Sequence, residues 1–391
     1  MNKKWECYET NEKQVEYIAR KYSISKLLAM ILVNRDIVEE EKVNVFLNPT
    51  RRDFYNPFLM PDMEKAVNRI INAIETHEKI MIFGDYDVDG ITSTTVLKKF
   101  LTDRNALVSE YIPNRLYEGY GLNKQAIKKI VDDKYNLIIT VDCGISGIEE
   151  VEYANSLGIE TIVTDHHEPG ETLPKALAVV DAKRKDNQYP FNSLAGVGVV
   201  FKLIQAISQK LNLEEKEYLK YLDLVCLGTI SDIVPLIDEN RVITKLGLKL
   251  VEVTKNIGLK TLLNISGYKT IDSNTISFGI APRINACGRM GYAKEALNLF
   301  FSEDEEEANQ IAQRLNEYNK ERQEIEQIEK QNENKEVIVL GKENWHHGVI
   351  GIVSSKITEM YFKPSILICF EEEMRKRFRK KYTSGSIYMK H

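Results

Sequence analysis

The chain has 391 residues and a formal net charge of -5, and 43% of its residues are hydrophobic and 28% are charged. A chain of this length exceeds a single compact core, so we expect two or three domains. The acidic balance excludes a generally basic coat for nucleic acid but allows a locally basic groove. Neither a signal peptide nor the ~18 apolar residues of a membrane span are found, which predicts a cytoplasmic protein. The five cysteines are widely spaced and form no CxxC pair, which predicts reduced thiols rather than disulfides or a zinc site.

The first part of the chain has helical patterns. Residues 1–60 combine short amphipathic stretches with the segment NPTRRDFYNP, and we expect a helical lead-in that covers the next domain. From Met63 to Thr76 the apolar residues recur at helical spacing, which predicts a helix. That helix leads into Ile80–Phe83, an apolar run typical of a buried strand.

Three acids at alternate positions follow this strand. Asp85, Asp87 and Asp89 lie between two glycines, and we expect the next helix to begin near Thr92. Carboxylates this close repel one another unless a positive group lies among them, and a divalent metal ion meets that need. A solvated acidic turn is the alternative, although such turns rarely separate an apolar strand from an apolar helix start. The pattern therefore predicts a metal site.

Apolar runs and helical patterns alternate after the acidic turn. Further strands are predicted at residues 106–112, 137–141, 159–164 and 176–180. This alternation predicts an α/β fold with a parallel sheet that is covered by helices on both faces. In such sheets the functional residues gather at the carboxyl ends of the strands.

More candidate metal ligands follow these strands. Asp142 comes directly after the third strand, and Asp165, His166 and His167 come after the fourth. Downstream, Asp232 lies between apolar residues, so its carboxylate needs a partner, and either the metal site or a helix-capping role would provide one. The mixture of carboxylate and imidazole favours Mn²⁺ or Mg²⁺ over structural zinc.

Two segments that contain glycine come next. The run Gly196–Phe201 has only part of a dinucleotide-binding fingerprint, so we interpret it as close backbone packing at a helix start. Residues 278–290, FGIAPRINACGRM, predict a loop that carries Arg283, Asn285 and Arg289. These side chains can bind phosphate oxygens, and ordinary salt bridging is the alternative.

The rest of the sequence predicts a long helix and a second domain. The helix covers residues 302–328 and leads to strands at 337–340 and 365–368 around a helix at 349–360. This order predicts a second, smaller and incomplete α/β domain. We expect four parts, namely a helical lead-in at 1–60, a catalytic domain at 61–240, a helical connector at 241–335 and the partial second domain at 336–391.

Five motifs, in this order and spacing, carry a family resemblance: GDYDVDG, VDCG, TDHH, GTISDIVPL and PRINACGRM. With them the sequence resembles the DHH phosphoesterases and, within that family, the RecJ exonucleases. The resemblance implies a metal-dependent 5'-to-3' exonuclease that releases mononucleotides from single-stranded DNA in recombination and DNA repair. It also implies a monomer that works with a single-strand-binding protein and a helicase.

The resemblance assigns roles to particular residues. It implies that two Mn²⁺ or Mg²⁺ ions, bridged by Asp142, are held by Asp85, Asp87, Asp89, Asp142, His166 and Asp232. The implied catalytic set is Asp87, Asp142, His166, His167 and Asp232. His167 would face the scissile phosphate, and Asp165 would orient the histidines. The walls of the DNA groove would carry Arg115, Arg283, Asn285 and Arg289. Many members of the family have a histidine at the position of Phe83, and Asp85 is expected to compensate.

The end of the chain departs from the family. Family members continue with a Gly-Ser-rich motif for the terminal 5' phosphate and an oligonucleotide-binding fold, whereas residues 375–381 here hold six basic residues. Lys376 to Tyr382 can be written in codons that, read one base later, encode a sequence close to that motif, so we hypothesise a frameshifted, truncated end. Two alternatives therefore stay open: a DHH phosphodiesterase for short oligonucleotides or cyclic dinucleotides, and a catalytically impaired fragment.

Overall fold

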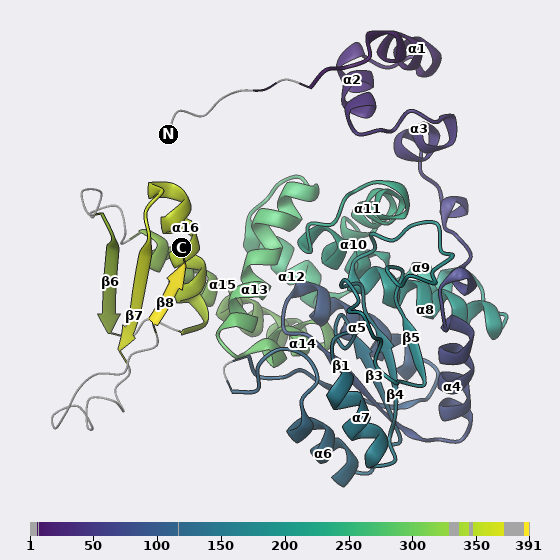
Figure 1. The fold of residues 1–391 in the computed structure, drawn as a ribbon, viewed down its shortest axis with the longest axis vertical. Coiled ribbons are helices and arrows are strands. Elements are labelled where there is room, and N and C mark those ends of the chain that lie inside the picture. Colours follow the sequence, from purple (N-terminus) through teal and green to yellow (C-terminus); the bar gives the residue numbers. More distant parts are fainter. Residues whose placement is uncertain are drawn as a thin grey trace.

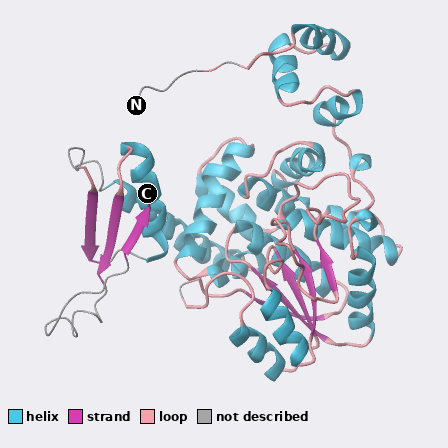
Figure 2. Ribbon diagram, in the orientation of Figure 1, coloured by secondary structure: helices cyan, strands magenta, loops and turns pink. Residues whose placement is uncertain are grey.

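The computed structural model describes residues 6, 8–115, 117–327, 336–343, 347–370 and 387–390. Two separate sheets organise these residues (Figures 1 and 2). A five-stranded sheet lies in the larger part of the molecule, and a three-stranded sheet lies near the C-terminal end.

The larger sheet is entirely parallel and has the order β2-β1-β3-β4-β5. Its strands are β1 (Lys79–Gly84), β2 (Leu107–Tyr111), β3 (Leu137–Val141), β4 (Glu160–Thr164) and β5 (Ala178–Val180). Each predicted apolar run therefore forms a strand, which confirms the predicted α/β fold. Because all five strands run the same way, their carboxyl ends share one edge of the sheet.

Helices cover both faces of this sheet (Figure 1). One face packs against α4 (Met63–Glu75), α5 (Val88–Thr102) and α8 (Gly196–Lys210). The opposite face packs against α6 (Lys124–Asp132) and α7 (Ile148–Ser156). Phe83 is fully buried on this second side, where its ring stacks on Tyr111 with centroids 5.2 Å apart.

The helix after the acidic turn begins earlier than the sequence predicted. It starts at Val88 rather than near Thr92, because the carboxylate of Asp87 caps it and accepts a hydrogen bond from Gly90 N at 3.1 Å. Asp89 therefore lies inside the first helical turn and is buried. The expected turn is thus shortened to Asp85 and Tyr86.

A series of helices follows α8 and shares the core of the sheet. They are α9 (Lys216–Leu219), α10 (Leu222–Ser231), α11 (Asp238–Val251), α12 (Ile257–Ser266), the π-helix η3 (Thr275–Ile280), α13 (Ala281–Arg289), α14 (Ala293–Phe301) and α15 (Glu305–Gln327). The prediction of a loop over residues 278–290 is wrong, since this segment is helical. Pro282 lies in the first turn of α13, which continues directly from η3, so the helical run changes from π to α next to this proline. Buried apolar residues before and after residue 240 belong to one cluster.

The N-terminal helices form a small cluster of their own. They are α1 (Glu12–Tyr22), α2 (Lys26–Asn34) and α3 (Glu40–Leu47), followed by two short 3-10 turns, Arg51–Asp53 and Pro57–Leu59. A buried ion pair ties the following segment to the main body, since Lys202 Nζ lies 2.8 Å from Glu239 Oε1 and also donates to Tyr55 O. Both charged side chains are fully buried.

The C-terminal sheet has the order β6-β7-β8. Its described elements are β6 (Ile338–Glu343), α16 (His347–Tyr361), β7 (Ser365–Phe370) and β8 (Ile387–Lys390), with β6 parallel and β8 antiparallel to β7. Met290 and Tyr318 join its small apolar core, which places it against α13 and α15. The basic run at 375–381 lies outside the described residues. Within the described ranges, no helix has both the length and the apolar character needed to cross a bilayer.

Candidate metal centre

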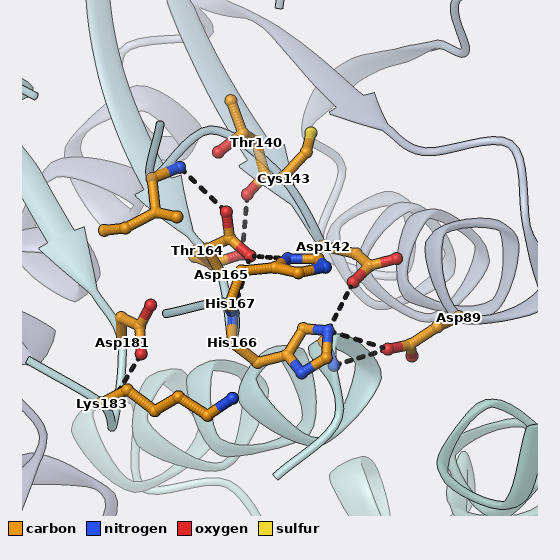
Figure 3. Close-up of polar contacts among 12 residues, drawn as sticks. Asp89, Thr140, Asp142, Cys143, Thr164, Asp165, His166, His167, Asp181 and Lys183 are labelled. Atoms are coloured by element: carbon orange, nitrogen blue, oxygen red, sulfur yellow. Dashed lines mark hydrogen bonds and ion pairs between the residues drawn. The ribbon is translucent and has the colours of Figure 1, made fainter. Parts of the chain in front are cut away.

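The candidate ligands come from different elements that end at one place. Asp85 follows β1, Asp142 follows β3, and Asp165, His166 and His167 follow β4. Asp232 arrives separately, as the residue that ends α10. Figure 3 shows Asp142 and Asp89 converging on the ring of His166.

Their ligand atoms form three groups, and within each group all the atoms lie within 4.8 Å of one another. The groups are Asp85 with Asp87 and Asp142, Asp89 with His166 and Asp232, and Asp142 with His166 and His167. All six side chains predicted to hold metal therefore belong to at least one group. Asp142 belongs to two of them, the position that a bridging ligand would need.

His166 belongs to two of the three groups. Its Nε2 is 3.0 Å from Asp142 Oδ1 and 3.8 Å from Asp89 Oδ2, and its Nδ1 is 3.7 Å from Asp232 Oδ2. None of these pairs has the geometry of a hydrogen bond, so both ring nitrogens lack a hydrogen-bond partner among the described residues. Asp85 Oδ1 and Asp142 Oδ1 are buried and lack one as well.

The buried carboxylates are crowded, and their pKa values are raised. Burial, followed by the charge of Asp87, raises the pKa of Asp85 to about 7. Burial and neighbouring acids also raise the pKa of Asp89 and of Asp142 well above the usual value, and raise that of Asp232 to about 6. Burial lowers the pKa of His166 to about 4, so its ring is neutral at pH 7. Buried acids, a neutral imidazole and unbonded lone pairs together fit a divalent cation.

The N-terminus of α8 holds one of these acids in place. Asp89 Oδ2 accepts a hydrogen bond from Gly196 N at 2.6 Å, and Asp89 Oδ1 accepts one from Val197 N at 2.8 Å. A Cβ at Gly196 would lie 2.6 Å from Asp142 Oδ1, so the helix can approach only with glycine there. This confirms the interpretation of Gly196–Phe201 as close packing, although the sequence did not indicate what it packs against.

Asp165 orients the histidine pair. Its Oδ1 accepts from the backbone N of His166 at 2.7 Å and lies 2.7 Å from the ring Nδ1 of His167. Its Oδ2 accepts from Ile145 N at 2.8 Å. The hydrogen bond and charge of Asp165 raise the pKa of His167. Asp165 thus fixes the His167 ring directly but reaches His166 only through the backbone.

A cavity of about 380 Å³ opens over these groups. Arg115, Asn285 and Arg289, the residues to which the resemblance assigned DNA binding, line it together with Asp85, Asp142 and His167. Arg283 does not line it, because its Nε donates to Asn316 Oδ1 at 3.0 Å and its Nη1 to Gly279 O. The helix explains the difference, since Asn285 and Arg289 are four residues apart on one face of α13 and Arg283 is not.

The sequence analysis missed several residues at this site. Tyr86 and Tyr120 line the cavity, and the Tyr120 ring meets that of His167 edge to face. Asp181 follows β5 at the same sheet edge, and burial raises its pKa to about 7. Lys183 extends toward His166 (Figure 3). The rule that an acid directly after a strand is a candidate would have found Asp181, whereas nothing in the pattern distinguished the two tyrosines.

The parallel sheet and the acids at its edge define a DHH domain, and the model of the DHH family, N-terminal domain, matches residues 79–229. The chain is 42% identical over 381 residues to the single-stranded-DNA-specific exonuclease RecJ of Bacillus subtilis, covering 95% of this chain and 48% of that protein. A crystal structure of exonuclease RecJ bound to manganese is 35% identical with a TM-score of 0.72, and the match covers 79% of this chain and 80% of that one. The Mn²⁺ complex of RecJ from Thermus thermophilus is 31% identical with a TM-score of 0.77, over 92% of this chain and 52% of that one.

The chain belongs to the RecJ family. It spans about half the length of the curated Bacillus subtilis relative, 48% of it.

Proposed function

We propose that the chain is a metal-dependent exonuclease that degrades single-stranded DNA from the 5' end and releases mononucleotides. The observation that carries this proposal is a single cavity that is lined by members of three overlapping acid and imidazole groups and by Arg115, Asn285 and Arg289. Metal ligands that face phosphate-binding cations are what phosphodiester hydrolysis needs. The RecJ relatives support the choice of single-stranded DNA as the substrate.

The metal would be Mn²⁺ or Mg²⁺, and we propose two ions. Six side chains would hold them: Asp85, Asp87, Asp89, Asp142, His166 and Asp232. When bound, such ions supply a hydroxide at neutral pH and neutralise charge that develops on the phosphate. The unbonded atoms of Asp85, Asp142 and His166 support this assignment.

The chain's own residues position the strand. Arg115 and Arg289 line one cavity, and the pKa of Arg289 is lowered by burial and then by the charge of Arg115. A phosphate bound there would relieve that repulsion and accept forked hydrogen bonds. Asn285 Oδ1 accepts from Val88 N at 3.3 Å, which fixes α13 against the first turn of α5. His167, held by Asp165, would place its Nε2 toward the scissile phosphate.

The experiment is degradation of a 5'-phosphorylated single strand that carries a label at its 3' end, in Mn²⁺. The proposal predicts a ladder of labelled products that shorten one nucleotide at a time, with mononucleotides released. A duplex of the same sequence should stay intact. Labelled products that appear only by internal cutting, or equal cutting of the duplex, would contradict it.

A phosphodiesterase for short substrates is the second candidate, since the same acid and imidazole groups and the same cavity would serve it. Rates on a dinucleotide, a cyclic dinucleotide and the long strand, measured together, separate the two. Hydrolysis of the dinucleotides alone would favour this candidate, and no hydrolysis of any substrate would favour the impaired fragment.

The proposal also covers the cellular location, the oligomeric state and the partners of the chain. We place it in the cytoplasm, in DNA recombination and repair, with the chain acting as a monomer. The partners that we propose are a single-strand-binding protein and a helicase, as the resemblance of the sequence motifs implies. Gel filtration of the chain, alone and with single-strand-binding protein, checks both the oligomeric state and that partnership.

A further inference from the structure

A second groove continues from the metal cavity. It has a volume of about 510 Å³ and shares Asn285 and Arg289 with the cavity, so the two form one continuous surface. Beyond these shared residues its walls are largely apolar, with Ile233, Leu236 and Phe278 among them. Since the cavity itself is lined by acids and cations, the chemistry of the surface changes on passing Asp232.

Ile233 is held in this groove at an energetic cost. It directly follows Asp232 at the end of α10, in the left-handed conformation with a φ of 61°. Glycine is the usual residue at this position after a helix, and a β-branched residue there is strained. Its side chain is 88% exposed, so packing does not repay that strain. Strained residues of this kind gather at sites that bind a ligand.

Phe278 is a second exposed apolar side chain of the same groove. It is 70% exposed although it belongs to a helix whose other large apolar residues, Ile276 and Ile280, are fully buried. That helix, η3, is a π-helix, a rare form that is frequent at functional sites. The groove thus presents an aromatic face and a branched apolar side chain to solvent.

Cations accompany these apolar side chains. Arg289 lines both the cavity and the groove, and Arg322 of α15 lines the groove, where its Nη2 donates to Asn319 Oδ1 at 3.1 Å. A positive groove with an exposed aromatic ring is the arrangement by which proteins bind single strands, because the cations follow the phosphates and the bases stack on the ring. The sharing of Asn285 and Arg289 continues the proposed phosphate track into this groove.

We propose that this groove binds the unpaired bases of the strand on the Asp232 side of the metal centre, with Phe278 as a stacking platform and Ile233 as an apolar contact. The inference rests on the proposed function and adds a source of strand specificity to it. Bases in a duplex are stacked and paired, so they offer no free face to Phe278. Selection of single strands would therefore begin beside the metal centre.

The test couples a change in the protein to a change in the DNA. Two single-stranded substrates are compared. The first has all its bases, and the second has a run of abasic sites that begins at about the third nucleotide, one or two bases from the cut. Release of the first mononucleotide in Mn²⁺ gives KM and kcat for the wild type, Phe278→Ala and Ile233→Ala. Tyr8→Ala and Leu27→Ala are matched controls, since both residues are exposed and lie in the N-terminal region.

We expect the abasic run to raise the KM of the wild type about tenfold, a typical value for one lost base stack. Phe278→Ala should raise KM on the normal strand by a similar factor, and the abasic run should then add little. Ile233→Ala should act in the same direction with a smaller change, and both controls should match the wild type. Equal KM values for Phe278→Ala and the wild type, or effects of the variant and the abasic run that multiply, would overturn the inference. A wild type that cuts neither strand would instead contradict the proposed function.

Discussion

At the scale of single residues, the metal centre is a place where acids are crowded rather than paired. Asp85, Asp89 and Asp142 are almost completely buried, and burial is the main cause that raises the pKa of each. Such groups are protonated more readily in the folded chain than in the unfolded one. The metal-free protein should therefore lose stability as they ionise, and a bound cation should restore it.

The first prediction concerns pH and metal. The folded pKa of Asp85 is about 7 against an ordinary 3.8, so the folded state binds more protons between these values and metal-free stability falls as pH rises through that window. At pH 8, Asp85→Asn should raise the Tm of the metal-free protein by a few degrees and reduce the further rise caused by Mn²⁺. Asp132→Asn, at an exposed position, is the control. Thermal melts with EDTA or Mn²⁺ measure both effects, and a lower metal-free Tm with an intact Mn²⁺ response would argue against a crowded metal site.

A second prediction concerns Asp165. In Asp165→Asn the ring Nδ1 of His167 loses its carboxylate partner, so the raised pKa of His167 should fall. Activity should decrease about 10- to 100-fold, as is typical when a residue that orients a functional group is lost. An NMR titration of the histidine ring protons reads the pKa, with the exposed His77 as an internal reference. An unchanged pKa of His167 would show that Asp165 does not control this ring.

At the scale of elements, the start of α8 contacts two of the candidate metal ligands. Its first two backbone N–H groups bind Asp89 of α5, and its first residue, Gly196, lies against Asp142 after β3. A helix N-terminus stabilises a buried carboxylate through its free N–H groups and its dipole. This contact couples the spacing of α5, α8 and β3 to the geometry of the candidate ligands.

The third prediction tests that contact. A Cβ in Gly196→Ala would lie 2.6 Å from Asp142 Oδ1, so α8 or Asp142 must move. We expect weaker Mn²⁺ binding by calorimetry and a fall in nuclease activity of at least about tenfold, as for other shifts of metal-ligand supports. Gly170→Ala is the matched control, because the nearest atom to its added Cβ is 3.9 Å away. Equal Mn²⁺ affinity in the two variants would mean that α8 does not set the ligand positions.

The elements also show what the sequence could predict. Apolar runs bounded by polar residues identified all five strands of the large sheet, and the acids and histidines after those strands identified the candidate ligands other than Asp232. The start of α5 was placed too late because Asp87 was considered only as a ligand and not as a helix cap. Residues 278–290 were predicted as a loop because Gly and Pro usually end helices, but here they occur where α13 tolerates them. The groove at Ile233 and Phe278 depends on tertiary contacts, which no local pattern carries.

At the scale of the whole molecule, the parallel sheet gives the site its order. The strand order β2-β1-β3-β4-β5 places the ends of β1, β3 and β4 side by side, and these three strands deliver Asp85, Asp142 and the histidine pair. Helices from the second half of the chain then close the cavity, since α10 brings Asp232 and α13 brings Asn285 and Arg289. Residues far apart in the sequence thus meet at one edge because the strands are parallel and adjacent.

The most direct test of the account compares the wild type with Asp142→Asn in the release of mononucleotides from single-stranded DNA, in Mn²⁺ and in EDTA. Asparagine suits this position because Asp142 has a φ of 59°, a conformation that Asn adopts readily, so the backbone should be preserved. The account predicts that the wild type releases mononucleotides in Mn²⁺ only. The rate of the variant should fall by more than about 100-fold, since the loss of a residue that only supports a metal ligand already lowers activity about 10- to 100-fold. Asp132→Asn should keep full activity. Release in EDTA, or similar rates for Asp142→Asn and the wild type, would contradict the claim that the Asp142 groups form a catalytic metal centre.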